Sequence, residues 1–162
     1  MAALTVDFLL DASIGRPRYL IRLFETARRR ALTLRKEKID ESDYLQAVEE
    51  LGWQVLEDFD RELSDVVPDA ESLLFRLAQL GASTNLDAVL ETINDMGLES
   101  VKPNVVIDVL IWTGCLGVKN GSKITYISDC GFRRQFVRTL MQKKKSEVIF
   151  HPTLASIFGG SE

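Results

Sequence analysis

Three side chains in this sequence could support nucleophilic or metal chemistry: Cys115, Cys130 and His151. A thiol beside an imidazole can form a nucleophile and its base, but no neighbouring residue in the sequence activates either group. The three also lack the paired spacing of a zinc site. We therefore expect no catalytic residue and no metal site in this chain.

Loops that bind phosphate or calcium have recognisable spacing, and none occurs here. The sequence contains no G-x-x-x-x-G-K-[ST] loop, whose backbone amides would surround phosphates, and no metal-binding acid that would accompany it. Its acidic run, residues 40–71, lacks the Asp/Gly spacing of a calcium loop. We expect that the chain is not an enzyme and holds no cofactor of its own.

Two arginines, Arg16 and Arg18, remain as candidates for binding an anion. Pro17 is favoured in the first turn of a helix, and Gly15 permits a sharp entry into it. Both arginines then lie in that first turn, where the helix dipole and the free amide groups attract negative charge. The alternative interpretation is a capped helix with two solvated arginines.

The elements that position these arginines are predicted to be helices. Residues 17–38 place apolar side chains at intervals of three and four, with arginines on the opposite face. Asp40 and Asp43 have the spacing of a capping box and open a helix that runs to about Leu63. We expect Asp69 to cap a further helix over residues 70–80.

Charge is segregated between the first two long helices. Residues 16–38 are rich in Arg and Lys, whereas residues 40–71 are acidic and contain one cation, Arg61. Opposite charges favour an antiparallel helical hairpin with complementary solvated faces. A basic stripe for nucleic acid is the alternative, although the acidic helix beside it would partly cancel its field.

The second half predicts helices over residues 85–96 and 103–114, then a β-hairpin. Asn120-Gly121 stands between alternating apolar residues, a pattern typical of a type I′ turn with both residues at positive φ. A helix near residues 132–140 and a strand at residues 148–150 follow. We expect a mostly α fold with a small β-hairpin wing: a helical lid-like bundle (residues 1–80) followed by a winged-helix domain (residues 81–162).

A winged helix raises the question of DNA binding. The helix before the hairpin would read bases with Arg, Lys, Asn or Gln along one face. Here the most polar stripe contains Asn104 and Asp108, and the aspartate repels phosphates. Cations in the wing and at residues 133–145 leave non-specific contact with nucleic acid open, but sequence-specific reading is not favoured.

Composition defines the class of protein. The chain has 162 residues, a formal net charge of −4 and 46% hydrophobic residues, enough for one domain or two small ones. Its uncharged apolar stretch at residues 109–118 is shorter than the roughly 20 residues of a membrane span. Residues 1–4 lack the basic flank of a secretory signal. With two cysteines, the sequence predicts a cytoplasmic protein.

Residues 15–22 (GRPRYLIR) resemble the second-sensor segment in the lid of AAA+-like P-loop ATPases. Residues 38–43 resemble the continuation of that lid in the signal-transducing (STAND-like) ATPases and their bacterial relatives, where a winged helix follows. Residues 110–118, 126–127 and 150–152 are similar to pieces of that winged helix. The resemblance covers nearly the whole chain, and the order of the pieces is more specific than any one of them.

The resemblance implies that Arg18 contacts the γ-phosphate of a nucleotide held by a neighbouring ATPase core, with Arg16 as a nearby helper. ATP and Mg²⁺ are then expected only where such a core is present. Implied partners are that core, another regulatory protein or a second copy of the chain. The function expected is a non-catalytic lid and winged-helix module. The alternatives are a winged-helix transcription regulator and a structural helical adaptor.

Overall fold

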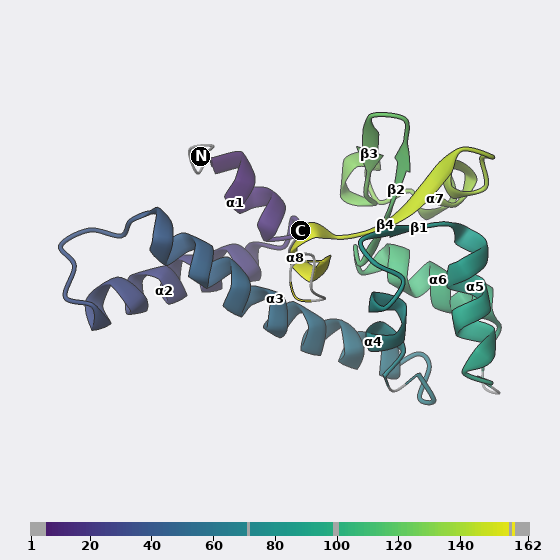
Figure 1. Ribbon diagram of the computed structural model, residues 1–162, viewed down its shortest axis with the longest axis horizontal. Coiled ribbons are helices and arrows are strands. Elements are labelled where there is room, and N and C mark those ends of the chain that lie inside the picture. Colours follow the sequence, from purple (N-terminus) through teal and green to yellow (C-terminus); the bar gives the residue numbers. More distant parts are fainter. Residues whose placement is uncertain (1–5, 71, 99–100, 156, 158–162) are drawn as a thin grey trace.

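The computed structural model describes residues 6–70, 72–98, 101–155 and 157. Its helices and small antiparallel sheet confirm the predicted mostly α fold class (Figure 1). The order of elements is α1 (Val6–Ala12), α2 (Pro17–Thr33), α3 (Glu41–Ser64), α4 (Leu73–Ala78), β1 (Ser83–Thr84), α5 (Leu86–Asp95), α6 (Pro103–Trp112), β2 (Leu116–Asn120), β3 (Lys123–Thr125), the 3₁₀ turn η1 (Ser128–Cys130), α7 (Arg134–Met141), β4 (Ser146–Phe150) and α8 (Pro152–Ala155).

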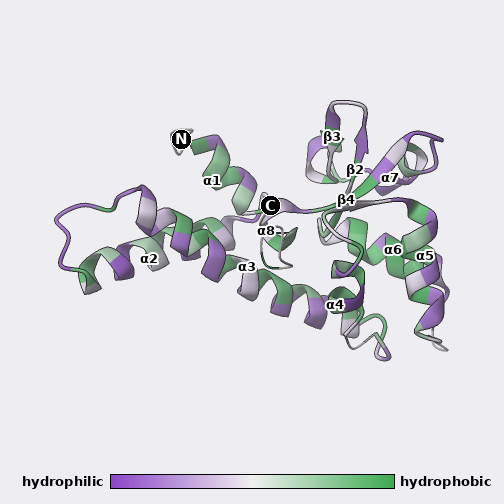
Figure 2. Cartoon of the chain, viewed as in Figure 1, coloured by the Kyte–Doolittle hydropathy of each residue, from purple (hydrophilic) through white to green (hydrophobic). Residues whose placement is uncertain are grey.

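Helices α2 and α3 form the predicted antiparallel hairpin, and hydrophobic and hydrophilic residues alternate along both (Figures 1 and 2). Helix α2 buries Tyr19, Leu23, Ala27 and Ala31, the stripe that its periodicity predicts. The chain then leaves the helix after Thr33, earlier than predicted. It re-enters at α3 through the predicted capping box, in which Asp40 and Asp43 each accept from the other's backbone amide.

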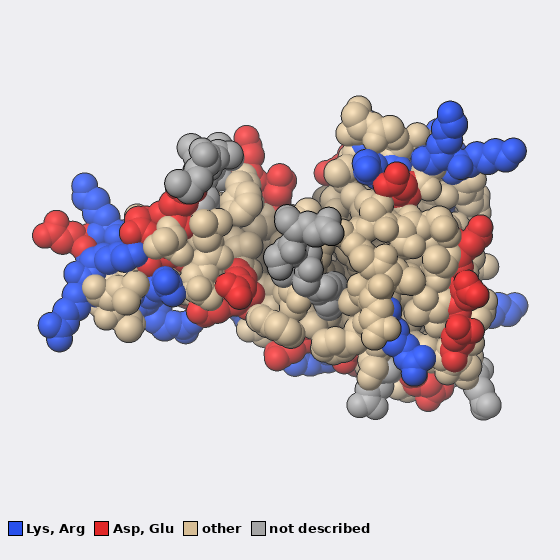
Figure 3. All heavy atoms as spheres, in the orientation of Figure 1, with Lys and Arg blue, Asp and Glu red and all other residues tan. Residues whose placement is uncertain are grey.

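Ion pairs join the two helices along their length, as their opposite charges predict. Arg29 contacts Glu50 at 3.2 Å near the middle of the hairpin. At the far end, Lys36 contacts Asp40 at 2.8 Å and the buried carboxylate of Asp43 at 2.9 Å. Figure 3 shows Lys and Arg gathered at this end of the molecule with acidic groups beside them. The charge segregation therefore serves packing between α2 and α3.

The connection from α3 to α4 differs from the sequence prediction. Helix α4 begins at Leu73, not at residue 70, and its N-cap residue is Ser72 rather than Asp69. Ser72 lies at φ 68, and its side chain makes no capping hydrogen bond. Burial of Leu73, Leu74 and Leu77 holds this short helix in place. Packing, rather than a local cap, decides where α4 starts.

The sheet has the strand order β1-β4-β2-β3, and all its pairs are antiparallel. Strands β2 and β3 form the predicted hairpin, but the predicted turn is wrong. Asn120 pairs with Lys123, so the turn residues are Gly121 and Ser122, and only Gly121 has positive φ (63°). Glycine alone at the first central position is typical of a type II′ turn.

The last described segment returns to the first helical hairpin. Helix α8 packs on α3 beside Gly52, where a Cβ atom would lie 2.7 Å from the carbonyl oxygen of Thr153. Thr153 also donates its hydroxyl to the carbonyl of Ala12 at 3.0 Å. Most of the buried apolar residues form one contiguous cluster that runs from Leu9 to Leu154. The division into residues 1–80 and 81–162 stays a prediction.

Candidate functional site

The turn between α1 and α2 sets the direction of both candidate arginines. Ile14 and Gly15 lie at φ 55° and 64°, and a β-branched residue rarely adopts this conformation. Ile14 is held there because its side chain packs against Gly114, where a Cβ atom would lie 3.0 Å from Ile14 Cγ2. Gly15 thus supplies the predicted sharp entry, and Pro17 occupies the first turn of α2 as predicted.

Arg16, the N-cap residue of α2, is committed to contacts within the protein. Its Nη1 donates to Glu62 Oε1, and its Nη2 donates to Glu62 Oε2 at 3.0 Å. The same Nη2 donates to the carbonyl oxygen of Thr113 at 3.0 Å. The guanidinium carbon also lies 5.1 Å from the centre of the Phe59 ring. Burial opposes the charge, but the hydrogen bond and attraction from Glu62 raise the pKa of Arg16.

Arg18 lies on the same side of α2 but is more open to solvent. Its side chain is 53% exposed, against 25% for Arg16. Its Nη2 lies 3.3 Å from Glu62 Oε1, 3.4 Å from Asp58 Oδ2 and 3.1 Å from the Tyr19 hydroxyl. The hydrogen bond with Tyr19, followed by weaker charge interactions, raises the pKa of Arg18. Arg18 can therefore exchange these contacts for a ligand in solvent, whereas Arg16 is more enclosed and bonds Glu62 through both carboxylate oxygens.

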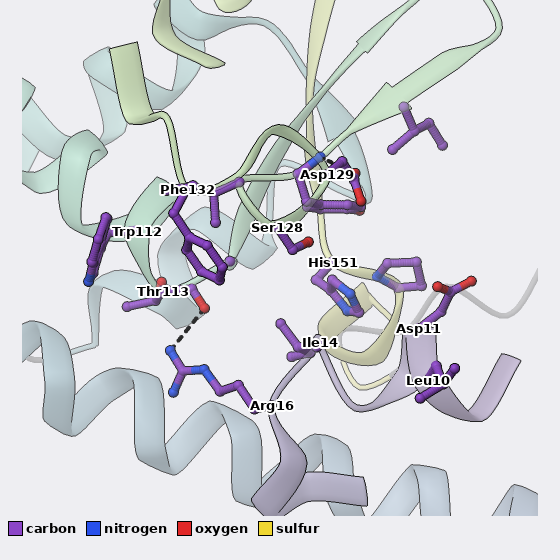
Figure 4. A pocket seen from close by; sticks show the side chains of 16 residues that line it. Leu10, Asp11, Ile14, Arg16, Trp112, Thr113, Ser128, Asp129, Phe132 and His151 are labelled. Carbon is purple, nitrogen blue, oxygen red and sulfur yellow. Dashed lines mark hydrogen bonds between the residues drawn. The ribbon is translucent and has the colours of Figure 1, made fainter. Parts of the chain in front are cut away.

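A groove of about 580 Å³ lies beside this turn (Figure 4). Leu10, Asp11 and Ile14 line one side, and Trp112 and Phe132 line the other. The rings of Trp112 and Phe132 meet edge to face, with centres 6.1 Å apart. The volume lies in the range of small-molecule sites. The groove adjoins Arg16, whose bond to Thr113 crosses its lower edge in the figure.

His151 lines this groove, and its backbone contacts the fully buried Cys115. The backbone amide of His151 donates to the carbonyl of Cys115 at 3.0 Å. Burial lowers the pKa of His151 to about 4, although Asp129 opposes this shift. Burial raises the pKa of the Cys115 thiol, whereas a nucleophilic cysteine needs a lowered pKa. Cys130 is partly buried, and its thiol contacts backbone carbonyls.

The polar residues of α6 are engaged by α7. Asp108 lies 3.4 Å from Arg134 and 3.7 Å from Arg138. Asn104 Oδ1 accepts a hydrogen bond from Arg138 Nη2 at 2.8 Å. Since these are the residues that would face a DNA groove, base recognition by this stripe would require α7 to give up its contacts.

Within the described ranges, no group of three or more His, Cys, Asp or Glu side chains could hold a metal ion. None of the helices in that part of the chain combines the length and apolar character that a membrane span requires.

Sequence reasoning found Arg16 and Arg18 but missed the groups that hold them. Glu62 and Asp58 belong to a long acidic helix in which no spacing distinguishes them. The carbonyl of Thr113 has no signature in sequence at all. The available signal was the apolar periodicity of α3, which puts Asp58 close to the face that packs on Tyr19. In the structure the Tyr19 hydroxyl donates a hydrogen bond to Asp58 Oδ2 at 3.0 Å.

The fold and site describe a mostly helical module in which the start of a helical hairpin carries Arg16, which lines a groove, and the half-exposed Arg18. Residues 2–60 match the family described as the FunZ-associated C-terminal helical domain. This match includes α1, α2 and most of α3, and with them both arginines. It fits a C-terminal helical domain of a larger protein. No curated protein and no solved structure matches the chain.

Proposed function

We propose that this chain is the non-catalytic C-terminal lid and winged-helix module of a cytoplasmic P-loop ATPase of the STAND/AAA+-like class. In this proposal Arg18 detects the γ-phosphate of ATP, and the second half of the chain makes regulatory contacts with other proteins. The chain supplies no catalytic group, and ATP with Mg²⁺ is bound by the ATPase core.

The observation that carries the proposal is the position of Arg18. Its guanidinium is half-exposed at the first turn of α2, where the helix dipole favours an anion. Its pair with the partly exposed Glu62 contributes only about 0–1 kcal/mol. Its other acidic partner, Asp58, is buried, but Asp58 also accepts a hydrogen bond from the Tyr19 hydroxyl at 3.0 Å and lies 3.8 Å from Arg61, so it keeps partners when Arg18 turns away. A charge-assisted bond to a phosphate can replace these contacts of Arg18 at little loss. The match of residues 2–60 to a C-terminal helical domain agrees with the coarser part of the proposal, a C-terminal module of a larger protein.

The order of elements in the second half supports the winged-helix part. Strand β1 precedes the helix pair α5–α6, and the β2–β3 hairpin follows it. Strand β4 is added between β1 and β2. Because Asn104 and Asp108 pair with α7, the proposal assigns this part to protein contacts rather than to reading DNA. Strongly salt-dependent binding of duplex DNA would instead favour the transcription regulator.

The test uses the P-loop ATPase that carries this chain, as wild type and as the Arg18→Ala and Arg22→Ala variants. Arg22 lies one turn further along α2 and is an exposed matched control. Limited proteolysis with ATP and with ADP measures nucleotide-dependent switching. We expect Arg18→Ala to abolish the difference between the two nucleotides and Arg22→Ala to retain it. Equal switching in all three proteins would contradict the proposal.

A further inference from the structure

Glu62, in the last turns of α3, is shared by both arginines. Arg16 takes both of its carboxylate oxygens, and Arg18 Nη2 approaches Oε1 at 3.3 Å. Two like charges thus compete for one carboxylate oxygen. Arg18 has further partners in Asp58 and the Tyr19 hydroxyl, so the contact with Glu62 is only one of its anchors.

Arg16 extends this cluster to the second half of the chain. Its bond to the Thr113 carbonyl reaches the C-cap of α6, one of the helix-end carbonyls that have no intrahelical donor. A cation there also interacts favourably with the negative end of the α6 dipole. We call the contacts of Arg16 with Glu62 and with Thr113 the Arg16 bridge. It connects the start of α2, the end of α3 and the end of α6; Figure 4 shows the bond between Arg16 and Thr113.

We propose that Glu62 is a positioning residue that links the state of Arg18 to the Arg16 bridge. The inference rests on the function proposed above. When Arg18 turns away to a phosphate, Glu62 Oε1 is left to Arg16 alone, and the repulsion between the two guanidinium groups decreases. Arg16 is then held more firmly by Glu62, and its hydrogen bond to the carbonyl of Thr113 becomes more stable. Binding of ATP therefore tightens the junction between the first hairpin and α6, and loss of the γ-phosphate loosens it.

Such coupling needs two sites whose contacts can change together, and Arg18 and the Arg16 bridge are two such sites. Arg18 is exposed enough to move, with 53% of its side chain accessible. Arg16 is enclosed by Phe59, Tyr19, Glu62 and Thr113 and transmits the change without moving far. Ile14, at φ 55°, packs against Gly114, the residue after Thr113, so the turn at residues 13–16 contacts the same end of α6 as Arg16 does.

The experiment measures amide hydrogen exchange of the 162-residue chain without nucleotide. The reporters are the amides of Thr113 and Gly114, which bond to carbonyls within α6. Arg18→Ala imitates the departure of Arg18, and we expect exchange there to become about two- to fivefold slower, the range that one surface ion pair supports. Glu62→Gln removes the shared charge, and we expect exchange about two- to fivefold faster. Arg22→Ala and Glu57→Gln, both exposed, are the matched controls and should change neither.

The opposite signs separate coupling from a structural role. If Arg18 only stabilised the fold, its removal would speed exchange at these amides, and this result or no change would overturn the proposal. Unchanged exchange in Glu62→Gln would overturn it as well. Central α3 amides report global stability and should be unaffected by Arg18→Ala. If these signs are found but Arg18→Ala leaves nucleotide switching of the ATPase intact, the coupling stands and the proposed function fails.

Discussion

His151 should lower the free energy of unfolding of this protein as the pH falls from about 7 to about 5. Most carboxylates titrate below this range. The residue is 6% exposed, and its Nδ1 accepts a hydrogen bond from the backbone amide of Thr153 at 3.3 Å. A proton on Nδ1 would break that bond and place a charge in an apolar site beside the ring of Tyr126, 4.9 Å away between ring centres. The folded protein therefore favours the neutral form.

The sign and size of the effect follow from the two pKa values. Burial lowers the pKa of His151 from 6.5 to about 4 in the folded state, so the unfolded chain takes up the proton first as pH falls. Stability is complete above the unfolded pKa and is lost progressively between 6.5 and about 4. From about pH 7 to about pH 5, this linkage lowers the free energy of unfolding by about 2 kcal/mol.

Urea denaturation followed by circular dichroism at several pH values measures this change. His151→Asn keeps a hydrogen-bond acceptor for Thr153 but does not titrate. Because the substitution can also change the stability at every pH, the two proteins are compared by how steeply the free energy of unfolding changes with pH. We expect the wild type to lose about 2 kcal/mol more than the variant over this interval. Equal slopes would refute the reasoning that His151 is buried and neutral.

Three other perturbations have defined outcomes. Gly52→Ala should lower the free energy of unfolding by about 1–3 kcal/mol, because its Cβ would meet the Thr153 carbonyl at 2.7 Å, and thermal denaturation measures it; an unchanged midpoint would mean that α8 does not dock there. Arg29→Glu should lower the free energy of unfolding by about 0.5–1 kcal/mol, because the attraction to Glu50 is lost and a repulsion replaces it. Urea denaturation at low salt measures this loss, and an unchanged free energy of unfolding would contradict the prediction. The purified chain should release no phosphate from ATP; turnover that survives repurification and is abolished by Arg18→Ala would show that the chain is an enzyme after all.

The elements that were predictable from sequence carry their signals locally. Pro17 near the start of α2 has no backbone N–H that would be left unpaired there. The Asp40–Asp43 capping box of α3 and Asn85 at the start of α5 accept hydrogen bonds from helix-end amides within three residues. The β2–β3 hairpin was predictable for the same reason. Its turn was misplaced by one residue because Gly121 suits the first central position of a type II′ turn as well as the second position of a type I′ turn.

The features that sequence did not reveal depend on distant partners. Strand β1 has two residues and no periodicity, and it exists because Ser83 and Thr84 pair with β4. In the sequence nothing distinguishes Gly52 from other helical residues, because the close approach of the Thr153 carbonyl is known only from the fold. In the site, the arginines were visible through their motif, but Glu62 and the Thr113 carbonyl become partners of Arg16 only when α3 and α6 meet.

The central claim is that Arg18 recognises the γ-phosphate, and the ratio of affinities for ATP and ADP tests it most directly. Isothermal titration of both nucleotides into the P-loop ATPase that carries this chain would compare wild type, Arg18→Ala and Arg22→Ala. Loss of one charge-assisted bond of about 1.5–3 kcal/mol predicts that Arg18→Ala weakens ATP binding by about tenfold or more and leaves ADP binding unchanged. Equal affinities of Arg18→Ala and wild type for ATP would contradict the account.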